Sequence, residues 1–445
     1  MDSVFSTLFH LYRTAEQLYA KISLVILALV VLLSLPACSV NPVTGKKELS
    51  WVSESAEIDI GTKQYAFQQQ AGGGYYELDP DLTAYVQSVG KKIVPFSSRS
   101  HLPYEFVVIN DSTPNAWALP GGKIAIHRGL LTELQDESEL AAVLAHEIVH
   151  ADARHSAQSQ EVGSLISAGQ LAANVILAQQ GIESESLQQG LAYGGLYGQT
   201  RYGRKRELLA DEYGMRYMSE AGYDPVGAIN LQKTFVALSA GRRSDFFSEL
   251  FASHPPSQSR VNANKKTARS LPPAGQRGRD RYQQELAKLR KRQPAYDKID
   301  EAKKAAGEKD YRQAIALADQ AIKMEPNEGL FFEIKGFAQS QLNRSADALK
   351  SYNEAVALNP GYFSPVLRRA LLKHELKSFQ AAEEDFRSSL AKLPTQIAYM
   401  GLGEIEEERN NCQSALQYYQ QAQGAGGQNK DQLEQKILAL QSTCR

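Results

Sequence analysis

The chain has 445 residues, enough for two or three domains of about 150 residues each, and its 43% hydrophobic and 22% charged residues exclude a collagen-like or largely disordered protein. The 49 basic and 50 acidic side chains give a formal net charge of -1, so overall charge does not favour a nucleic acid partner. Three cysteines, Cys38, Cys412 and Cys444, are too few for a multi-cysteine metal site.

The first patterned segment is apolar and lies near the N-terminus. Residues 22–35 (ISLVILALVVLLSL) form an uncharged, mostly apolar run that follows Arg13 and Lys21. A membrane-spanning helix needs about 20 such residues, whereas the hydrophobic region of a signal peptide needs only about 7–15. The run therefore predicts a signal peptide over residues 1–37, with an uncleaved anchor as the alternative.

The end of this run and the next three residues, Leu35-Pro36-Ala37-Cys38, resemble the lipobox of bacterial lipoproteins, in which the cysteine is lipidated and becomes the first residue. With Ser39 behind it, the resemblance implies a lipid on Cys38 and sorting to the outer membrane of a Gram-negative bacterium. The mature chain would then lie in the periplasm, an oxidising compartment. Because Cys412 and Cys444 are the two remaining thiols, we predict a disulfide between them; two free cysteines are the alternative.

Residues 38–268 mix strand-like runs with helical patterns and predict an α+β domain. The runs at residues 105–110 (EFVVIN) and 123–127 (KIAIH) predict strands. The second of these strands precedes the helix with the strongest chemical signal. We therefore expect residues 123–127 to be the sheet edge that binds an extended peptide by strand addition.

Residues 136–158 (DESELAAVLAHEIVHADARHSAQ) predict a buried helix that carries a metal-binding motif. Asp136 and Glu139 resemble a capping box at its start. His146 and His150 are four residues apart and share one helix face, so both imidazoles can bind one metal ion. Zinc suits two histidines and a carboxylate with one position left open, and Glu147 can act as the general base.

The third ligand is predicted on a second helix, residues 201–214 (RYGRKRELLADEYG). Glu207 would bind the metal, and Asp211, on the same face, would hydrogen-bond a ligand histidine or assist protonation. An exposed charged helix is the alternative for this segment. His155 lies nine residues after His146, which is roughly the opposite side of a continuous helix, and we expect it to face away from the site.

The string HExxH followed by ExxAD resembles the gluzincin metalloproteases of the HtpX/Ste-type/Oma-type family over about residues 41–268. The segments at residues 41–45 (NPVTG), 115–122 (NAWALPGG) and 253–256 (SHPP) are similar to that family as well. The resemblance implies a zincin-like fold with one zinc ion per chain, and it places His254 near the cleft. His254 would either fill the open zinc position and keep the protease latent, which we favour, or stabilise the oxyanion as a catalytic group. A structural role in its loop is the third possibility.

Residues 269–295 are rich in lysine and arginine and contain two adjacent prolines. Such a composition is typical of a solvated segment between domains. We therefore expect a basic linker at residues 269–295, with separable domains on either side of it.

Residues 296–445 repeat with a period of 34 residues, the spacing that separates Pro326 from Pro360 and Pro360 from Pro394. Alanines at the helix crossings follow the same period: Ala314, Ala348 and Ala382. A helix-turn-helix unit of this length resembles the tetratricopeptide repeat, which stacks into an all-α solenoid with a concave groove.

Together, these patterns and resemblances imply a lipid-anchored periplasmic zinc metalloendopeptidase for quality control of outer-membrane and periplasmic proteins. Misfolded or stalled proteins would be its substrates, and the repeats would bind substrate or the β-barrel assembly machinery. The alternative is a chaperone or scaffold of outer-membrane protein assembly whose protease is normally latent. No nucleic acid partner is expected.

Overall fold

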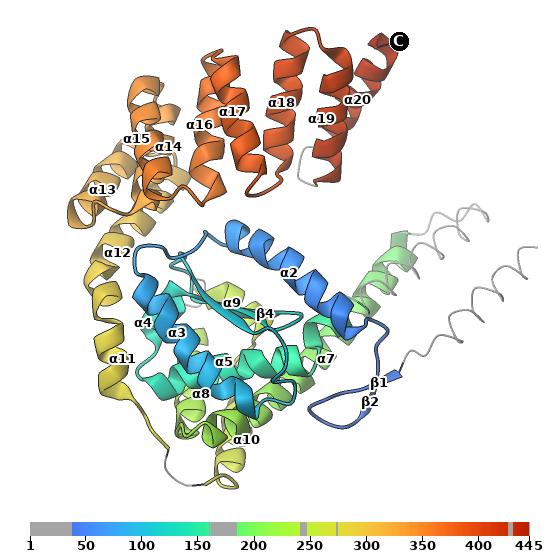
Figure 1. Ribbon diagram of the computed structural model, residues 1–445, viewed down its shortest axis with the longest axis vertical. Coiled ribbons are helices and arrows are strands. Elements are labelled where there is room, and N and C mark those ends of the chain that lie inside the picture. The colour runs from blue at the N-terminus through green and yellow to red at the C-terminus, as the bar shows by residue number, and fades with distance from the viewer. Residues whose placement is uncertain are drawn as a thin grey trace, which may run out of the picture.

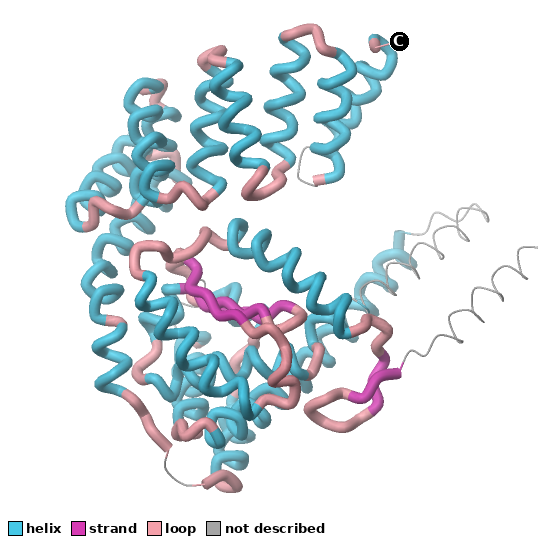
Figure 2. The backbone as a smooth tube through the Cα atoms, viewed as in Figure 1, coloured by secondary structure: helices cyan, strands magenta, loops and turns pink. Residues whose placement is uncertain are grey.

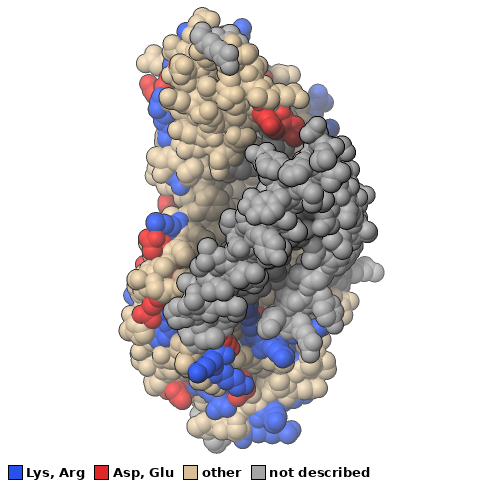
Figure 3. Space-filling view, turned by 90° about the vertical axis from the view of Figure 1, so that its right-hand side faces the viewer, with Lys and Arg blue, Asp and Glu red and all other residues tan. Residues whose placement is uncertain are grey.

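The computed structural model describes residues 38–159, 161, 185–240, 247–272, 275–425 and 430–444. The predicted signal peptide at residues 1–37 therefore lies outside the described residues. An α+β domain forms the lower part of the molecule in Figure 1, and a helical solenoid arches over it. None of the described helices combines the length and the apolar character that crossing a membrane requires. Side chains of both charges are scattered over the described face in Figure 3, in line with the near-zero net charge.

The central sheet has three strands, shown in magenta in Figure 2: β3 (Glu105–Ile109), β4 (Ala116–Leu119) and β5 (Lys123–His127). Their order is β3-β5-β4, with β5 parallel to β3 and antiparallel to β4. The prediction that residues 123–127 form the sheet edge is therefore wrong, because β5 hydrogen-bonds to a strand on each side. The two edge strands are β3 and β4, and β4 was not indicated by the strand-like runs of the sequence. A second, two-stranded sheet pairs β1 (Cys38–Val40) with β2 (Lys47–Leu49).

The two faces of the sheet are buried against different layers, because side chains alternate along a strand. On one face, Val107, Ile109 and Ala125 pack with Tyr65 of α2 (Glu54–Ala71). On the other face, the side chains of residues 106, 108, 124 and 126 join the main hydrophobic core. That core also takes in α3 (Pro80–Ile93), which leads into the short helix η1 (Val94–Phe96).

The helix α5 (Glu137–Asp152) is buried along almost its whole length beneath the sheet. Its N-cap is Asp136, whose side chain accepts a hydrogen bond from the backbone of Glu139, as the capping-box pattern predicted. The other helices of this domain are α4 (Arg128–Glu133), α7 (Glu185–Glu220), α8 (Val226–Ser239), α9 (Ser248–Ser253) and α10 (Gln258–Ala268).

The segment expected to be a solvated linker is helical, as α11 (Arg279–Glu285) and the start of α12 (Ala287–Gly307), and it is docked on the α+β domain. Tyr282, Leu286 and Leu289 are completely buried and belong to the same core as the helices around α5. Their spacing of four and three residues forms an apolar stripe within a basic sequence. The expectation of a solvated linker is wrong because this stripe is buried in the core. Basic side chains of the segment also pair with buried carboxylates of the α+β domain: Arg277 with Asp136, Arg281 with Glu137 and Lys288 with Asp79.

The repeats form antiparallel helix pairs: α13 (Tyr311–Met324), α14 (Gly329–Gln341), α15 (Ser345–Leu358), α16 (Phe363–Glu375), α17 (Phe379–Leu390), α18 (Gln396–Glu408), α19 (Cys412–Gly424) and α20 (Lys430–Thr443). The alanines that set the 34-residue period are completely buried between these helices: Ala314, Ala348 and Ala382. The turns before α13, α15, α17 and α19 each contain one residue with left-handed backbone: Lys309, Asn343, Lys377 and Asn410. The predicted all-α repeat architecture is confirmed.

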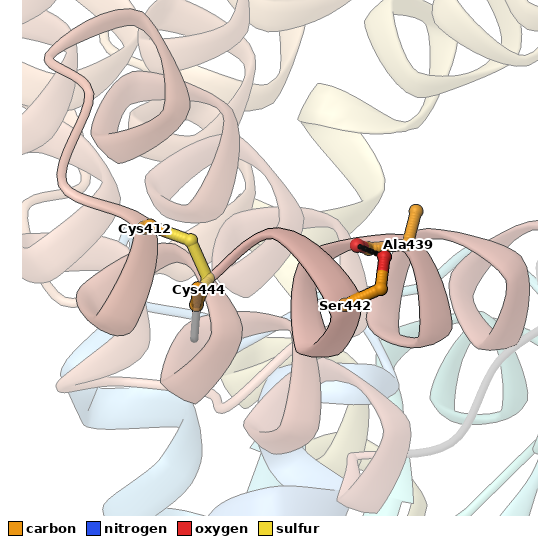
Figure 4. Close-up of a disulfide and its surroundings, with 4 residues drawn as sticks. All are labelled: Cys412, Ala439, Ser442 and Cys444. Carbon is orange, nitrogen blue, oxygen red and sulfur yellow. Dashed lines mark hydrogen bonds between the residues drawn. A yellow bond between two sulfur atoms is a disulfide. The ribbon is translucent and has the colours of Figure 1, made fainter.

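A disulfide joins Cys412 at the start of α19 to Cys444, which directly follows α20 (Figure 4). The two Cα atoms are 5.7 Å apart. Between the two helices lies a small apolar cluster of its own, separate from the main core and formed by Ala415, Tyr419, Ala422, Leu433 and Ile437. The disulfide therefore closes the last helical hairpin of the solenoid.

Candidate active site

The site is built where α5 crosses α7 beneath the sheet. His146 and His150 lie on the face of α5 that meets α7, and Glu207 comes from α7. Gly214 allows the close crossing, because a Cβ atom at this position would lie 3.1 Å from the backbone nitrogen of His146. The sequence therefore places three potential metal ligands on two tightly packed helices.

The metal-binding atoms of these residues converge on one point. The Nε2 atoms of His146 and His150 are 3.1 Å apart, and Glu207 places one carboxylate oxygen 3.3 Å from the first and the other 3.2 Å from the second. His254 joins them with Nδ1 at 3.1 Å from Glu207 Oε2 and 3.3 Å from His146 Nε2. All four potential ligand atoms lie within 4.8 Å of one another.

His254 reaches this cluster from the loop between α9 and α10. It is the C-cap of α9, and its backbone nitrogen donates to the carbonyl of Leu250 at 2.7 Å. Its second ring nitrogen, Nε2, lies 3.5 Å from Glu147 Oε1. His254 therefore lies between the potential ligands and the glutamate of the HExxH motif.

Asp211 supports the cluster from one turn further along α7. One of its carboxylate oxygens lies 3.0 Å from Nδ1 of His146, and Arg260 of α10 donates two hydrogen bonds to it, both at 2.7 Å. Burial alone would raise the pKa of Asp211, but the guanidinium of Arg260 outweighs it and lowers that pKa. The sequence alone assigned no role to Arg260; the signal that could have found it is that a buried carboxylate such as Asp211 requires a cation.

His155 also lies at the site, so the prediction that it faces away is wrong. Its Nδ1 is 3.1 Å from Nδ1 of His150, and the two ring centroids are 4.8 Å apart. The prediction assumed one continuous helix, but α5 ends at Asp152 and Arg154 adopts a left-handed backbone with φ of 60°. Burial, together with the neighbouring His150, lowers the pKa of His155 to about 2.

Several buried groups of the cluster have strongly shifted pKa values. Burial opposes a charge on His146, but the carboxylates of Glu207 and Asp211 raise its pKa to about 10. Burial likewise opposes a charge on Glu207, yet His254 and His146 lower its pKa well below the ordinary value. Buried carboxylates that remain ionised beside several imidazoles are typical of a site for a cation.

The donor set fits zinc on chemical grounds. Two imidazoles and a carboxylate are the protein ligands of many catalytic zinc sites, and a third imidazole is available in His254. His146 is backed by a carboxylate, as ligand histidines usually are. The Arg260 guanidinium also reaches Glu207 Oε2, at 3.0 Å, and adds a positive charge beside this carboxylate.

A cavity of about 300 Å³ opens next to this cluster. Glu147, His150 and His254 line it on the side of the site, and Trp117 and Ala118 of the edge strand β4 line it as well. A volume of this size suits part of a peptide chain. Trp117 also packs edge-to-face against Tyr65, with centroids 6.0 Å apart, so its ring contributes to both the core and the cavity wall.

Comparison with known families identifies the domain. The sequence profile of peptidase family M48 matches residues 80–268, which include every residue of the cluster. Residues 80–268 are a peptidase family M48 domain. Tetratricopeptide repeat profiles match residues 299–363 and 367–430. The predicted α+β metalloprotease domain followed by an all-α repeat domain is confirmed.

Several curated proteins are similar in sequence to this chain. The mitochondrial metalloendopeptidase OMA1 of Schizosaccharomyces pombe is 38% identical over 181 residues, which are 40% of this chain and 51% of that protein. The beta-barrel assembly-enhancing protease of Escherichia coli K12 is 29% identical over 262 residues, 56% of this chain and 51% of that one. Its Vibrio cholerae counterpart is 33% identical over 201 residues, 44% of this chain and 41% of that one. The chain thus spans about half of the length of these relatives.

Proposed function

We propose that the M48 domain is a zinc endopeptidase whose metal ligands are His146, His150 and Glu207. The observation that carries this proposal is the convergence of their ligand atoms, with that of His254, within 4.8 Å. Glu147, which follows the first ligand in the HExxH motif, lines the adjoining cavity and is 3% exposed. An acidic side chain in this position is suited to general base catalysis.

Zinc, when bound, would supply a Lewis acid that polarises the scissile carbonyl and lowers the pKa of a nearby water. Glu147 would accept a proton from the attacking water and pass it to the nitrogen of the leaving amine. Asp211 would hold His146 in the tautomer that presents Nε2 to the metal, because its carboxylate accepts a hydrogen bond from Nδ1. The side of β4 that does not pair with β5 would orient an extended substrate by backbone hydrogen bonds.

His254 is assigned a regulatory role in this proposal. Its Nδ1 lies among the ligand atoms, so a neutral imidazole here would occupy the zinc position that substrate needs. This arrangement supports latency over direct catalysis, because a fourth protein ligand excludes the reacting groups. Opening would require the loop between α9 and α10 to withdraw His254 from the cluster.

The biological role that we propose is quality control of outer-membrane and periplasmic proteins by a chain that is lipid-anchored at Cys38. Two relatives are named for enhancing β-barrel assembly, and the repeats offer a solenoid suited to protein partners. Misfolded or stalled proteins would be the substrates, and the β-barrel assembly machinery would be a partner of the repeats. A chaperone or scaffold with a normally latent protease remains the second candidate, because His254 lies within the metal cluster.

Cleavage of casein by the purified chain tests the enzymatic proposal. Activity should disappear with a zinc chelator and return when zinc is added in excess of the chelator. A chain that binds unfolded casein, but cleaves none even with His254 replaced, would favour the chaperone. Trapping with Glu147→Gln in membranes would then identify the substrates and test the proposed location.

A further inference from the structure

The Nδ1 atoms of the two α5 histidines, His146 and His150, face chemically different partners. Nδ1 of His146 faces the carboxylate of Asp211 at 3.0 Å, whereas Nδ1 of His150 faces Nδ1 of His155 at 3.1 Å. Nε2 of His150 lies 3.2 Å from Glu207 Oε1 and therefore points to the proposed metal position. A histidine that binds metal through Nε2 carries its hydrogen on Nδ1, so His155 must offer a lone pair to it.

We propose that His155 is a positioning residue that accepts this hydrogen bond and thereby fixes the tautomer and ring orientation of His150. The proposal rests on the metal site proposed above. The neutral imidazole of His155 would accept the hydrogen bond from Nδ1 of His150, as the Asp211 carboxylate accepts the hydrogen bond from Nδ1 of His146. The two metal-binding histidines would then be supported by chemically different groups.

The turn after α5 is what brings His155 back to His150. Ala153 is the C-cap of α5, Arg154 has φ of 60°, and a new helical segment starts at His155. A left-handed backbone is unfavourable for a residue with a side chain and persists only where the surroundings impose it. The left-handed conformation of Arg154 therefore indicates that contacts with other parts of the chain stabilise this turn.

The groups that impose this turn come from the N-terminal part of the chain. Nε of Arg154 lies 3.1 Å from Glu57 Oε2, and its guanidinium also donates to the carbonyl of Val52. Glu57 of α2 is completely buried, and Arg99 binds both of its oxygens, at 3.0 and 2.9 Å. These ion pairs anchor the turn, because removing either arginine would leave the buried carboxylate of Glu57 incompletely paired.

Glu57 lies before the segment that the M48 profile matches, which starts at residue 80, whereas its two arginine partners lie within that segment. The helix α2 would thus contribute to the metal site through the turn at Arg154. The rival explanation is that His155 only fills space, since it is 5% exposed. The two explanations make different demands on the side chain at position 155. Packing requires only its volume, whereas positioning of His150 requires a hydrogen-bond acceptor at the place of Nδ1.

Zinc affinity of the full chain separates these explanations. His155→Asn keeps an acceptor near the position of Nδ1, and His155→Leu keeps much of the volume without an acceptor. We expect zinc to bind about 10–100-fold more weakly to the leucine variant, and within about threefold of wild type to the asparagine variant. The dissociation constants would be measured by competition with a chromophoric chelator. The exposed His101, replaced by leucine, is the matched control and should leave zinc binding unchanged.

Cobalt substitution gives a second readout that does not depend on activity. Each ligand histidine of the cobalt-loaded protein should show one exchangeable, paramagnetically shifted ring N–H signal. The signal of His150 should be lost or broadened in His155→Leu and kept in His155→Asn. Should the leucine variant fail to fold, His155→Gln replaces it, because its acceptor lies farther from the position of Nδ1 and should support zinc less well than asparagine.

Equal zinc affinity and an unchanged cobalt spectrum in wild type, the asparagine variant and the variant without an acceptor at Nδ1 would overturn the positioning role. An equal loss of affinity in all His155 variants would overturn it as well, since only volume would then matter. Failure of the wild-type chain to bind zinc at all would instead refute the metal site itself. The two proposals therefore fail in distinguishable ways.

Discussion

The guanidinium carbon of Arg128 lies 3.4 Å from the ring centroid of Tyr296, and both side chains are completely buried. Arg128 opens α4 of the M48 domain, whereas Tyr296 belongs to α12, which leads into the repeats. The hydroxyl of Tyr296 donates to Glu328 at 2.5 Å, and Nε of Arg128 donates to Asn110 at 2.8 Å. A buried cation–π contact with paired polar groups therefore joins the two domains.

This contact predicts that the domains unfold together. Tyr296→Ala should lower the free energy of unfolding by about 3–5 kcal/mol, because it leaves a cavity and removes the stacking partner of a buried cation. Urea unfolding followed by circular dichroism and by the fluorescence of Trp51 and Trp117, both of which precede the repeats, should show one coincident transition in wild type. The half-exposed Phe67 of α2 is the control, and its replacement by alanine should cost much less.

Two separate urea transitions, or a stable and soluble fragment ending near residue 270, would contradict the shared core. Limited proteolysis between residues 275 and 294 should likewise be slow in the native chain, because Tyr282, Leu286 and Leu289 would have to leave the core. Slow cleavage is the opposite of what a solvated, basic linker between separable domains would show.

The parts of the molecule that the sequence predicted are those specified by local spacing. His146, His150 and Glu207 follow from helical periodicity on two helices, and the repeat alanines follow from a fixed period. The position of His155 could not be predicted, because it depends on a left-handed arginine that tertiary contacts impose. Whether β4 or β5 forms the sheet edge depends on long-range pairing, which short strands do not reveal.

The pH dependence of the metal-free protein should reveal the buried state of His155. Burial lowers the pKa of His155 to about 2, whereas in the unfolded chain it is about 6.5. Between these values the unfolded chain binds more protons, so stability falls as the pH drops below 6.5. Relative to His155→Asn, which does not titrate, the metal-free wild type should lose up to about 1 kcal/mol per pH unit.

Thermal unfolding of both chains in excess chelator at pH 7, 6 and 5 measures this difference. The melting temperature of the wild type should decrease more steeply with acidity than that of His155→Asn. If the melting temperatures of the two chains changed in parallel with pH, His155 would be protonated equally in the folded and unfolded chains. That result would contradict its buried contact with His150.

The disulfide between Cys412 and Cys444 should stabilise the end of the solenoid only. In the chain-entropy model, closing a loop of this size contributes about 3–4 kcal/mol. Because the apolar cluster between α19 and α20 is separate from the main core, replacing both cysteines by serine should increase hydrogen exchange in these two helices and leave α5 unchanged.

Mass spectrometry of non-reduced peptides provides the direct check of that bond. A peptide pair linked through Cys412 and Cys444 is expected from protein secreted to the periplasm. Alkylation of both thiols in the native, non-reduced chain would show that the disulfide does not form.

Replacing His254 tests whether the site is latent. His254→Ala should raise casein turnover several-fold, because it removes an imidazole that lies among the metal ligand atoms. A decrease of about 10²–10³-fold would instead assign His254 to stabilisation of the oxyanion. Unchanged turnover would contradict both roles. Zinc content should remain near one per chain, since three ligands persist.

The most direct test of the central claim compares zinc content and casein cleavage in Glu147→Gln and Glu207→Ala. The account predicts that Glu147→Gln keeps about one zinc per chain and loses at least about 10²-fold in cleavage, the usual contribution of a general base. Glu207→Ala should lose the zinc as well, while the exposed neighbour Glu212, replaced by alanine, should change neither quantity. A fully metallated Glu207→Ala chain, or undiminished cleavage by Glu147→Gln, would contradict the account.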